Sequence, residues 1–162
     1  MRRSRSPRIQ GYVEAPNLYT GAGPALFLAG GITGCPDWQA QAVHLLRTAG
    51  VDWVILNPRR PRHPVSPVAN RTVAAEQTAW EYRHLRAAQA ILFWFPPSAS
   101  AQPIALYELG ACVAGGKPLA VGAAPSYPRR LDVILQLSHA RPGLVVRDTL
   151  ADTVGDMARV CS

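Results

Sequence analysis

Glu108 is the single charged residue in the apolar stretch from Pro103 to Val113. The upstream run Ala90–Phe95 is short and wholly apolar, which is typical of a buried strand. A strand, a polar loop and an apolar helix would bring Glu108 to the carboxyl edge of a parallel sheet, where open α/β folds bind ligands. Because an unpaired buried carboxylate is costly, Glu108 is either exposed or used by a site.

A second carboxylate, Glu81, lies between Trp80 and Tyr82 in a predicted helix over residues 72–88. An isolated helical glutamate is most simply a surface residue. This helix, however, should enter the sheet edge that also carries Glu108. A carboxylate there can hold a sugar hydroxyl or transfer a proton.

A glycine-rich turn, Gly30-Gly31-Ile32-Thr33-Gly34, follows the apolar run Ala25–Ala29. Glycines let a ligand approach the backbone, and free amides can bind a hydroxyl or a phosphate. The spacing matches neither a dinucleotide fingerprint nor a P-loop. A tight turn between strand and helix is the alternative interpretation.

Two further positions at predicted strand ends carry groups that bind ligands. Asn57, Arg59 and Arg60 follow the strand over residues 52–56, where arginines can bind a phosphate or a carboxylate or remain solvated. Trp94 ends the strand over residues 90–95, and its ring can stack on a base or fill the core.

The apolar runs alternate with helical patterns about five times, which predicts an α/β fold with a five-stranded parallel sheet covered on both faces. The expected strands span residues 25–29, 52–56, 90–95, 117–121 and 144–146. The expected helices span residues 36–49, 72–88, 103–114, 129–139 and 149–160, and a long proline-containing loop spans 57–70.

At 162 residues the chain suits one domain, with 48% hydrophobic and 17% charged residues. Four arginines fall within the first eight residues; without them 13 basic side chains face 10 acidic ones. We therefore predict a flexible basic arm over residues 1–24 and a single domain over 25–162, and a nucleic-acid partner is not indicated.

Composition also bears on cofactors and location. Three widely spaced cysteines without a CxxC pair, and four scattered histidines, favour neither a disulfide framework nor a metal site. The histidines His44, His63, His84 and His139 are expected on the surface or in loops. The chain lacks a membrane-spanning apolar run and a signal-peptide pattern, so we expect a cytoplasmic protein without a cofactor.

Taken together, these segments resemble the nucleoside 2-deoxyribosyltransferase superfamily, and most closely its deoxyribosyltransferase-like branch. The resemblance runs from about residue 25 to residue 147, and the order and spacing of its motifs make it specific. The matching motifs are Phe27–Gly34, Asn57–Arg60, Trp80–Leu85 with Ile91–Pro96, and Pro103–Gly110.

The resemblance implies a flavodoxin-like, Rossmann-like three-layer fold and homo-oligomers with shared active sites. It also implies cleavage of the N-glycosidic bond of a nucleoside or nucleotide. By position Glu108 matches the family's nucleophile, and Glu81 falls where an aspartate usually contacts the base or sugar. Gly30 and Gly31 match the turn that lines the sugar pocket.

The chain departs from the family pattern at three places. Gln102 replaces an aspartate six residues before the nucleophile; an amide can bind a hydroxyl or a base but cannot donate a proton as an acid. Phe27 replaces a tyrosine of the first strand, and Tyr107 is a candidate substitute for the missing hydroxyl. The partner-subunit asparagine corresponds to Asp132 or Gln136.

We therefore expect a nucleoside 2-deoxyribosyltransferase or an N-glycosidase. Glu108 would attack the anomeric carbon, Glu81 would protonate the leaving base, and water or a second base would resolve the glycosyl ester. The alternatives are a glycohydrolase acting on a dinucleotide such as NAD, and a non-catalytic nucleotide-binding or sensor module.

Overall fold

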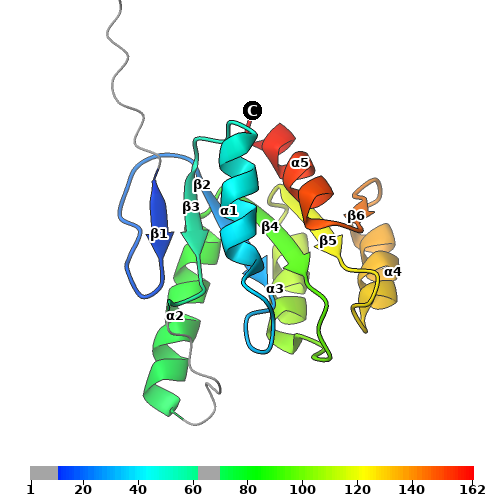
Figure 1. Cartoon of the computed structure of the whole chain (residues 1–162), viewed down its shortest axis with the longest axis horizontal. Helices are drawn as coiled ribbons and strands as arrows, with labels where there is room; N and C mark the ends of the chain where they lie inside the picture. The colour runs from blue at the N-terminus through cyan, green and yellow to red at the C-terminus, as the bar shows by residue number, and fades with distance from the viewer. Residues whose placement is uncertain (1–10, 62–69) are drawn as a thin grey trace, which may run out of the picture.

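The computed structural model describes residues 11–61 and 70–162 and shows a parallel sheet between two layers of helices (Figure 1). The predicted α/β class is confirmed. The six strands are β1 (Tyr12–Glu14), β2 (Ala25–Gly30), β3 (Val54–Asn57), β4 (Ala90–Phe95), β5 (Leu119–Ala123) and β6 (Val146–Arg147).

Helices connect the strands and cover both faces of the sheet. Helices α1 and α5 lie on one face, and α2 and α3 lie on the other with α4 beside α3 (Figure 1). Their bounds are α1 (Trp38–Thr48), α2 (Arg71–Ala87), α3 (Pro103–Ala114), α4 (Arg130–Ala140) and α5 (Leu150–Val160). Every helix expected from the sequence is present.

The strand order is β1-β3-β2-β4-β5-β6, with every pairing parallel. From β3 to β6 this is the flavodoxin-like order, in which the chain winds outward from β2 in both directions. The sheet has one strand more than the five predicted. The additional strand, β1, pairs with β3 and lies within the segment predicted to be an arm, whereas residues 1–10 with the basic cluster fall outside the described residues.

The central strands form the core because they are apolar on both faces. All six residues of β4 are buried, as are Ala25–Ala29 of β2. Their register pairs Phe27 with Ile91 and Ala29 with Phe93, so these side chains share the face covered by α2. The Phe27 ring lies 6.0 Å from the ring of Trp80 on α2, which fixes this helix against the sheet.

His84 on α2 is fully buried, and its predicted surface position is wrong. Its Nε2 accepts a hydrogen bond from the Tyr19 amide at 3.0 Å, and its Nδ1 lies 2.7 Å from the Trp80 carbonyl oxygen. An amide can only donate and a carbonyl can only accept, so the ring is neutral with its hydrogen on Nδ1. Burial accordingly lowers the pKa of His84, and the ring ties the segment before β2 to α2.

Within the described part of the chain, no helix has both the length and the apolar character needed to cross a membrane.

Candidate active site

The loops after β2 and β4 lie at the point where the sheet order reverses. Strand β2 has β3 on one side and β4 on the other, so the connections leaving β2 and β4 turn to opposite faces and leave a crevice between them. The glycine turn lies in the first loop, and the segment leading to α3 lies in the second. The candidate residues at Gly30, Gly31 and Gln102 are therefore brought together.

The first two glycines of the turn, Gly30 and Gly31, have neighbours too close for a side chain. Gly30 has φ +149°, and a Cβ there would lie 2.0 Å from the Trp94 carbonyl oxygen. A Cβ at Gly31 would lie 2.4 Å from Oε1 of Gln102 and 2.6 Å from Sγ of Cys35. The turn thus packs directly against the start of α3. Ile32 is half-buried and Thr33 is exposed in the same loop.

Gln102 precedes α3 in a left-handed backbone conformation, with φ 52° and ψ 57°. Only 5% of the residue is exposed. Its Nε2 donates to the Pro96 carbonyl oxygen at 3.2 Å, while its Oε1 is buried without a hydrogen-bond partner among the described residues. Such a backbone costs about 1–3 kcal/mol and clusters at functional sites, which supports a role for this loop in binding.

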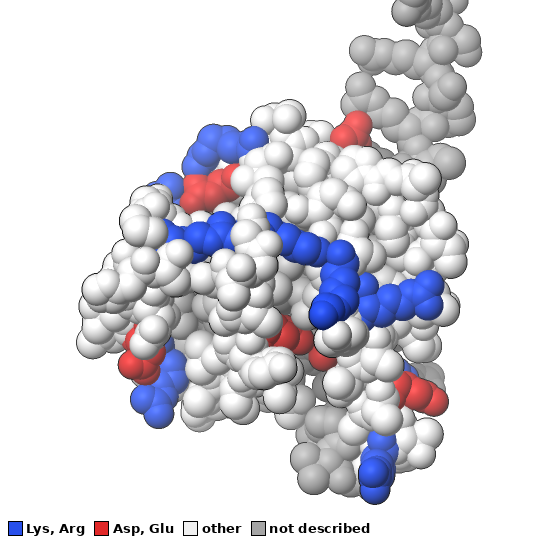
Figure 2. Space-filling model, turned by 180° about the vertical axis from the view of Figure 1, so that it is seen from behind, with Lys and Arg blue, Asp and Glu red and all other residues white. Residues whose placement is uncertain are grey.

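Glu108 lies in the second turn of α3 and is half-buried. Within the described residues its carboxylate has no hydrogen bond and no ion pair. Burial, followed by the negative charge of Glu81, raises the pKa of Glu108 to about 8. Figure 2 shows the face covered by α2 and α3, where acidic atoms are set back beside a band of basic side chains.

Glu81 on α2 is also half-buried, but it has partners. Its Oε1 accepts a hydrogen bond from Nε2 of Gln77 at 2.7 Å. Burial raises the pKa of Glu81, while the Gln77 hydrogen bond and the charge of Arg60 oppose that rise. The ionised form is therefore better supported on Glu81 than on Glu108.

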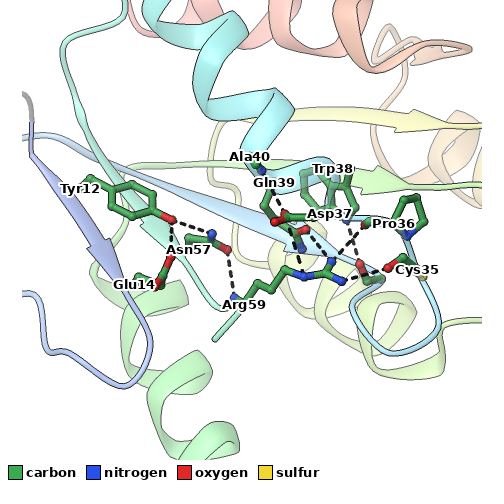
Figure 3. Close-up of polar contacts among 11 residues, drawn as sticks. Tyr12, Glu14, Cys35, Pro36, Asp37, Trp38, Gln39, Ala40, Asn57 and Arg59 are labelled. Carbon is green, nitrogen blue, oxygen red and sulfur yellow. Dashed lines mark hydrogen bonds and ion pairs between the residues drawn. The ribbon is translucent and has the colours of Figure 1, made fainter. Parts of the chain in front are cut away.

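Asn57 and Arg59 brace the loop after β2 (Figure 3). The Arg59 guanidinium donates to the carbonyl oxygens of Cys35 and Pro36 at 2.9 and 3.0 Å, and to Oε1 of Gln39 at 3.1 Å. Asn57 Oδ1 accepts from the Arg59 amide at 2.9 Å. These bonds give both residues a positioning role, and their contact with a substrate stays a prediction.

Of the remaining predicted binding residues, Trp94 lies on the other face of the sheet, and Tyr107 and Asp132 are exposed on their helices. The Trp94 ring packs beside Gly122, where a Cβ would lie 2.8 Å from its Cε3. Side chains alternate along β4, so Trp94 faces α1 and α5 and points away from Glu108. Tyr107 is 77% exposed on α3, and Asp132 is exposed on α4, 3.2 Å from Arg129.

Sequence reasoning missed Gln77 and the β1 residue Tyr12. Gln77 precedes Glu81 by four positions, a spacing that places both on one helix face and that could have revealed the pair. Tyr12 accepts a hydrogen bond from Nδ2 of Asn57 at 2.9 Å, and no local pattern indicates this contact. The described residues contain no cluster of side chains that could hold a metal ion.

The raised pKa of Glu108 predicts a pH-dependent effect of Glu108→Gln on stability. The carboxyl ionises near pH 4.5 in the unfolded chain and near pH 8 in the folded protein. Between these values the folded state binds more protons, so the ionised carboxylate destabilises the fold increasingly as the pH rises. The variant should exceed the parent in unfolding free energy by about 1–3 kcal/mol at pH 8.5, and by much less at pH 5.

Denaturant unfolding at both pH values measures this difference. Glu76→Gln, which removes an exposed carboxylate from α2, is the matched control and should show no such pH dependence. Equal stability of the parent and Glu108→Gln at pH 8.5 would mean that Glu108 is not buried against a second negative charge.

Two comparisons with known proteins bear on this site. A search of curated proteins found no significant match. The family model described as nucleoside 2-deoxyribosyltransferase like matches residues 23–127, which include the glycine turn, Glu81 and Glu108. Because this match covers more than half of the chain, the protein belongs to the nucleoside 2-deoxyribosyltransferase-like family.

Proposed function

We propose that this protein cleaves the N-glycosidic bond of a (deoxy)nucleoside or nucleotide, and transfers the sugar to another base or to water. Membership of the family implies chemistry on nucleoside N-glycosidic bonds in general. The observation that carries the proposal is the pair of half-buried carboxylates, Glu81 on α2 and Glu108 on α3, whose negative charges interact.

The reaction needs one carboxylate as a nucleophile and one acid for the departing base. The raised pKa of Glu108 favours this residue as the holder of the proton in the free protein. Transfer of this proton to Glu81 would create both groups at once, because Glu108 becomes the anion and Glu81 becomes the acid. Two carboxyl groups whose charges repel are suited to sharing one proton in this way.

In the first half of the reaction Glu108 attacks the anomeric carbon as the bond to the base breaks. The base leaves with the proton from Glu81, and a glycosyl ester on Glu108 remains. In the second half, water or a second base attacks the same carbon while Glu81, now a carboxylate, takes its proton; Glu108 is released, and the configuration is retained. The anionic carboxylate also stabilises the positive charge that develops on the sugar.

Base release from candidate substrates tests the proposal. The protein is incubated with deoxynucleosides, deoxynucleoside monophosphates and NAD, with and without an acceptor base, and the free base is followed by chromatography. We expect turnover of a nucleoside or nucleotide. Glu108→Ala should reduce it by about 1,000-fold or more without unfolding the protein, whereas Glu76→Gln should retain it.

The pattern of products distinguishes the alternatives. Base exchange supports a transferase, and release without exchange supports a hydrolase. Release from NAD alone would contradict the proposed substrate class, and calorimetric binding without turnover would favour a sensor. Activity retained in Glu108→Ala would exclude Glu108 as the nucleophile.

We also propose that copies of this chain associate through the face formed by α2, α3 and α4. Large apolar side chains are exposed on all three helices, whereas none of comparable size is exposed on α1 or α5 in the described residues. The exposed residues are Tyr82, Ile104, Tyr107, Leu131 and Leu135. Exposed apolar side chains of this kind mark interaction surfaces, and these include residues on α2 and α3, the helices that carry the two carboxylates.

Association through this face predicts a concentration-dependent oligomer in sedimentation or solution scattering. Ile104→Asp should shift the population toward monomer, because a charge would be buried in the contact. Gln41→Asp places the same charge on the exposed side of α1 and should leave the assembly unchanged. A parent protein that is monomeric at every concentration would contradict this proposal.

A further inference from the structure

A chain of hydrogen bonds starts at Arg60 in the loop after β3, passes through Gln77 on α2 and ends on Glu81. Nε of Arg60 donates to Oε1 of Gln77 at 2.8 Å. Nε2 of Gln77 then donates to the Pro58 carbonyl oxygen at 2.8 Å and to Oε1 of Glu81 at 2.7 Å. Gln77 itself is only 8% exposed, so these are the contacts of a buried amide.

The partners of this amide allow only one orientation. A guanidinium only donates, so the Gln77 atom facing Arg60 is the oxygen. A carbonyl only accepts, so the atom facing Pro58 is the nitrogen. With the amide fixed, Oε1 of Glu81 always faces an N–H group. A proton on that oxygen would meet a donor, and any proton on Glu81 must therefore lie on Oε2.

No hydrogen-bond donor among the described residues fixes the Glu108 carboxylate in the same way. The charge that acts on Glu108 comes from Glu81 on α2, and Glu108 in turn raises the pKa of Cys112 one turn later on α3. Lys117, before β5, acts on Cys112, but its ammonium is bound to three carbonyl oxygens around the end of α2. On the Glu81 side, Arg60 supplies positive charge, with Glu76 3.8 Å from its Nη2.

We propose that Gln77 is a positioning residue that assigns the shared proton: it keeps Oε1 of Glu81 unprotonated, confines proton exchange to Oε2, and leaves the resting proton on Glu108. Arg60 supports this role by fixing the amide. During the reaction the proton would leave Glu108, reach Oε2 of Glu81, and depart with the base. This last step rests on the proposed function, whereas the assignment of the proton in the free protein does not.

Gln77→Leu tests the proposal, because leucine approximates the size of glutamine but neither donates nor accepts. The readout is a titration of ¹³C-labelled glutamate carboxyl groups by NMR in the protein without substrate, with Glu108 assigned from the Glu108→Gln spectrum. Loss of the donor should favour a neutral Glu81, which then repels Glu108 less. The Glu108 midpoint should fall by about one pH unit.

Arg60→Gln provides a second variant in case Gln77→Leu does not fold. It removes the charge while keeping a group that can donate to Gln77, so the midpoint should fall in the same direction but by less. Gln41→Leu is the matched control on the exposed side of α1 and should leave the midpoint unchanged. An unchanged Glu108 midpoint in both folded variants would overturn the proposal.

Activity measurements separate this proposal from the proposed function. If the protein turns over a nucleoside, Gln77→Leu should also move the fall of kcat/KM at high pH to lower pH, because loss of the Glu108 proton leaves the pair without an acid for the base. A fall in the Glu108 midpoint without turnover of any substrate would leave the proton assignment standing and remove the proposed function. Turnover that depends on Glu108, with an unchanged Glu108 midpoint in Gln77→Leu, would support the proposed function and overturn the proton assignment.

Discussion

The repulsion between Glu81 and Glu108 is the constraint on which this structure depends. Two carboxylates held half-buried on neighbouring helices oppose folding, because each is removed from water and raises the cost of ionising the other. The surrounding sheet must supply the compensating stability. It does so through central strands that are buried on both faces and through helices fixed by aromatic contacts such as Phe27 with Trp80.

The same topology gives this unfavourable pair a place where it can act. Helix α3 follows β4 after the loop over residues 96–102, and side chains on α2 and α3 lean toward the helix N-terminus. At the strand reversal, the glycine turn after β2 packs against the start of α3. The Arg59 guanidinium donates hydrogen bonds to carbonyl oxygens of the residues that follow the glycine turn, and Gln102 packs against Gly31. The loops after β2 and β4 are therefore held in place before a ligand binds.

Much of this arrangement could be predicted from the sequence because its signals are local. The run Ala90–Phe95 predicts a buried strand because every residue is apolar. Glu108 is a candidate site residue because nothing else in its helix is charged. Strand β1 was missed because three residues at a sheet edge carry no periodicity. The burial of His84 and the orientation of Trp94 depend on tertiary partners, the Tyr19 amide and Gly122, which no sequence window contains.

Trapping the covalent intermediate tests the central claim, attack by Glu108, most directly. A nucleoside carrying fluorine at the 2′ carbon slows both steps by opposing positive charge on the sugar, and the intermediate accumulates if the second step is slowed more. Peptide mass spectrometry after incubation should locate one added fluorosugar on Glu108, with one equivalent of base released. Base release with the sugar bound to Glu81 would contradict the account. So would base release with no sugar on the protein when the second step is slow enough for an ester to accumulate.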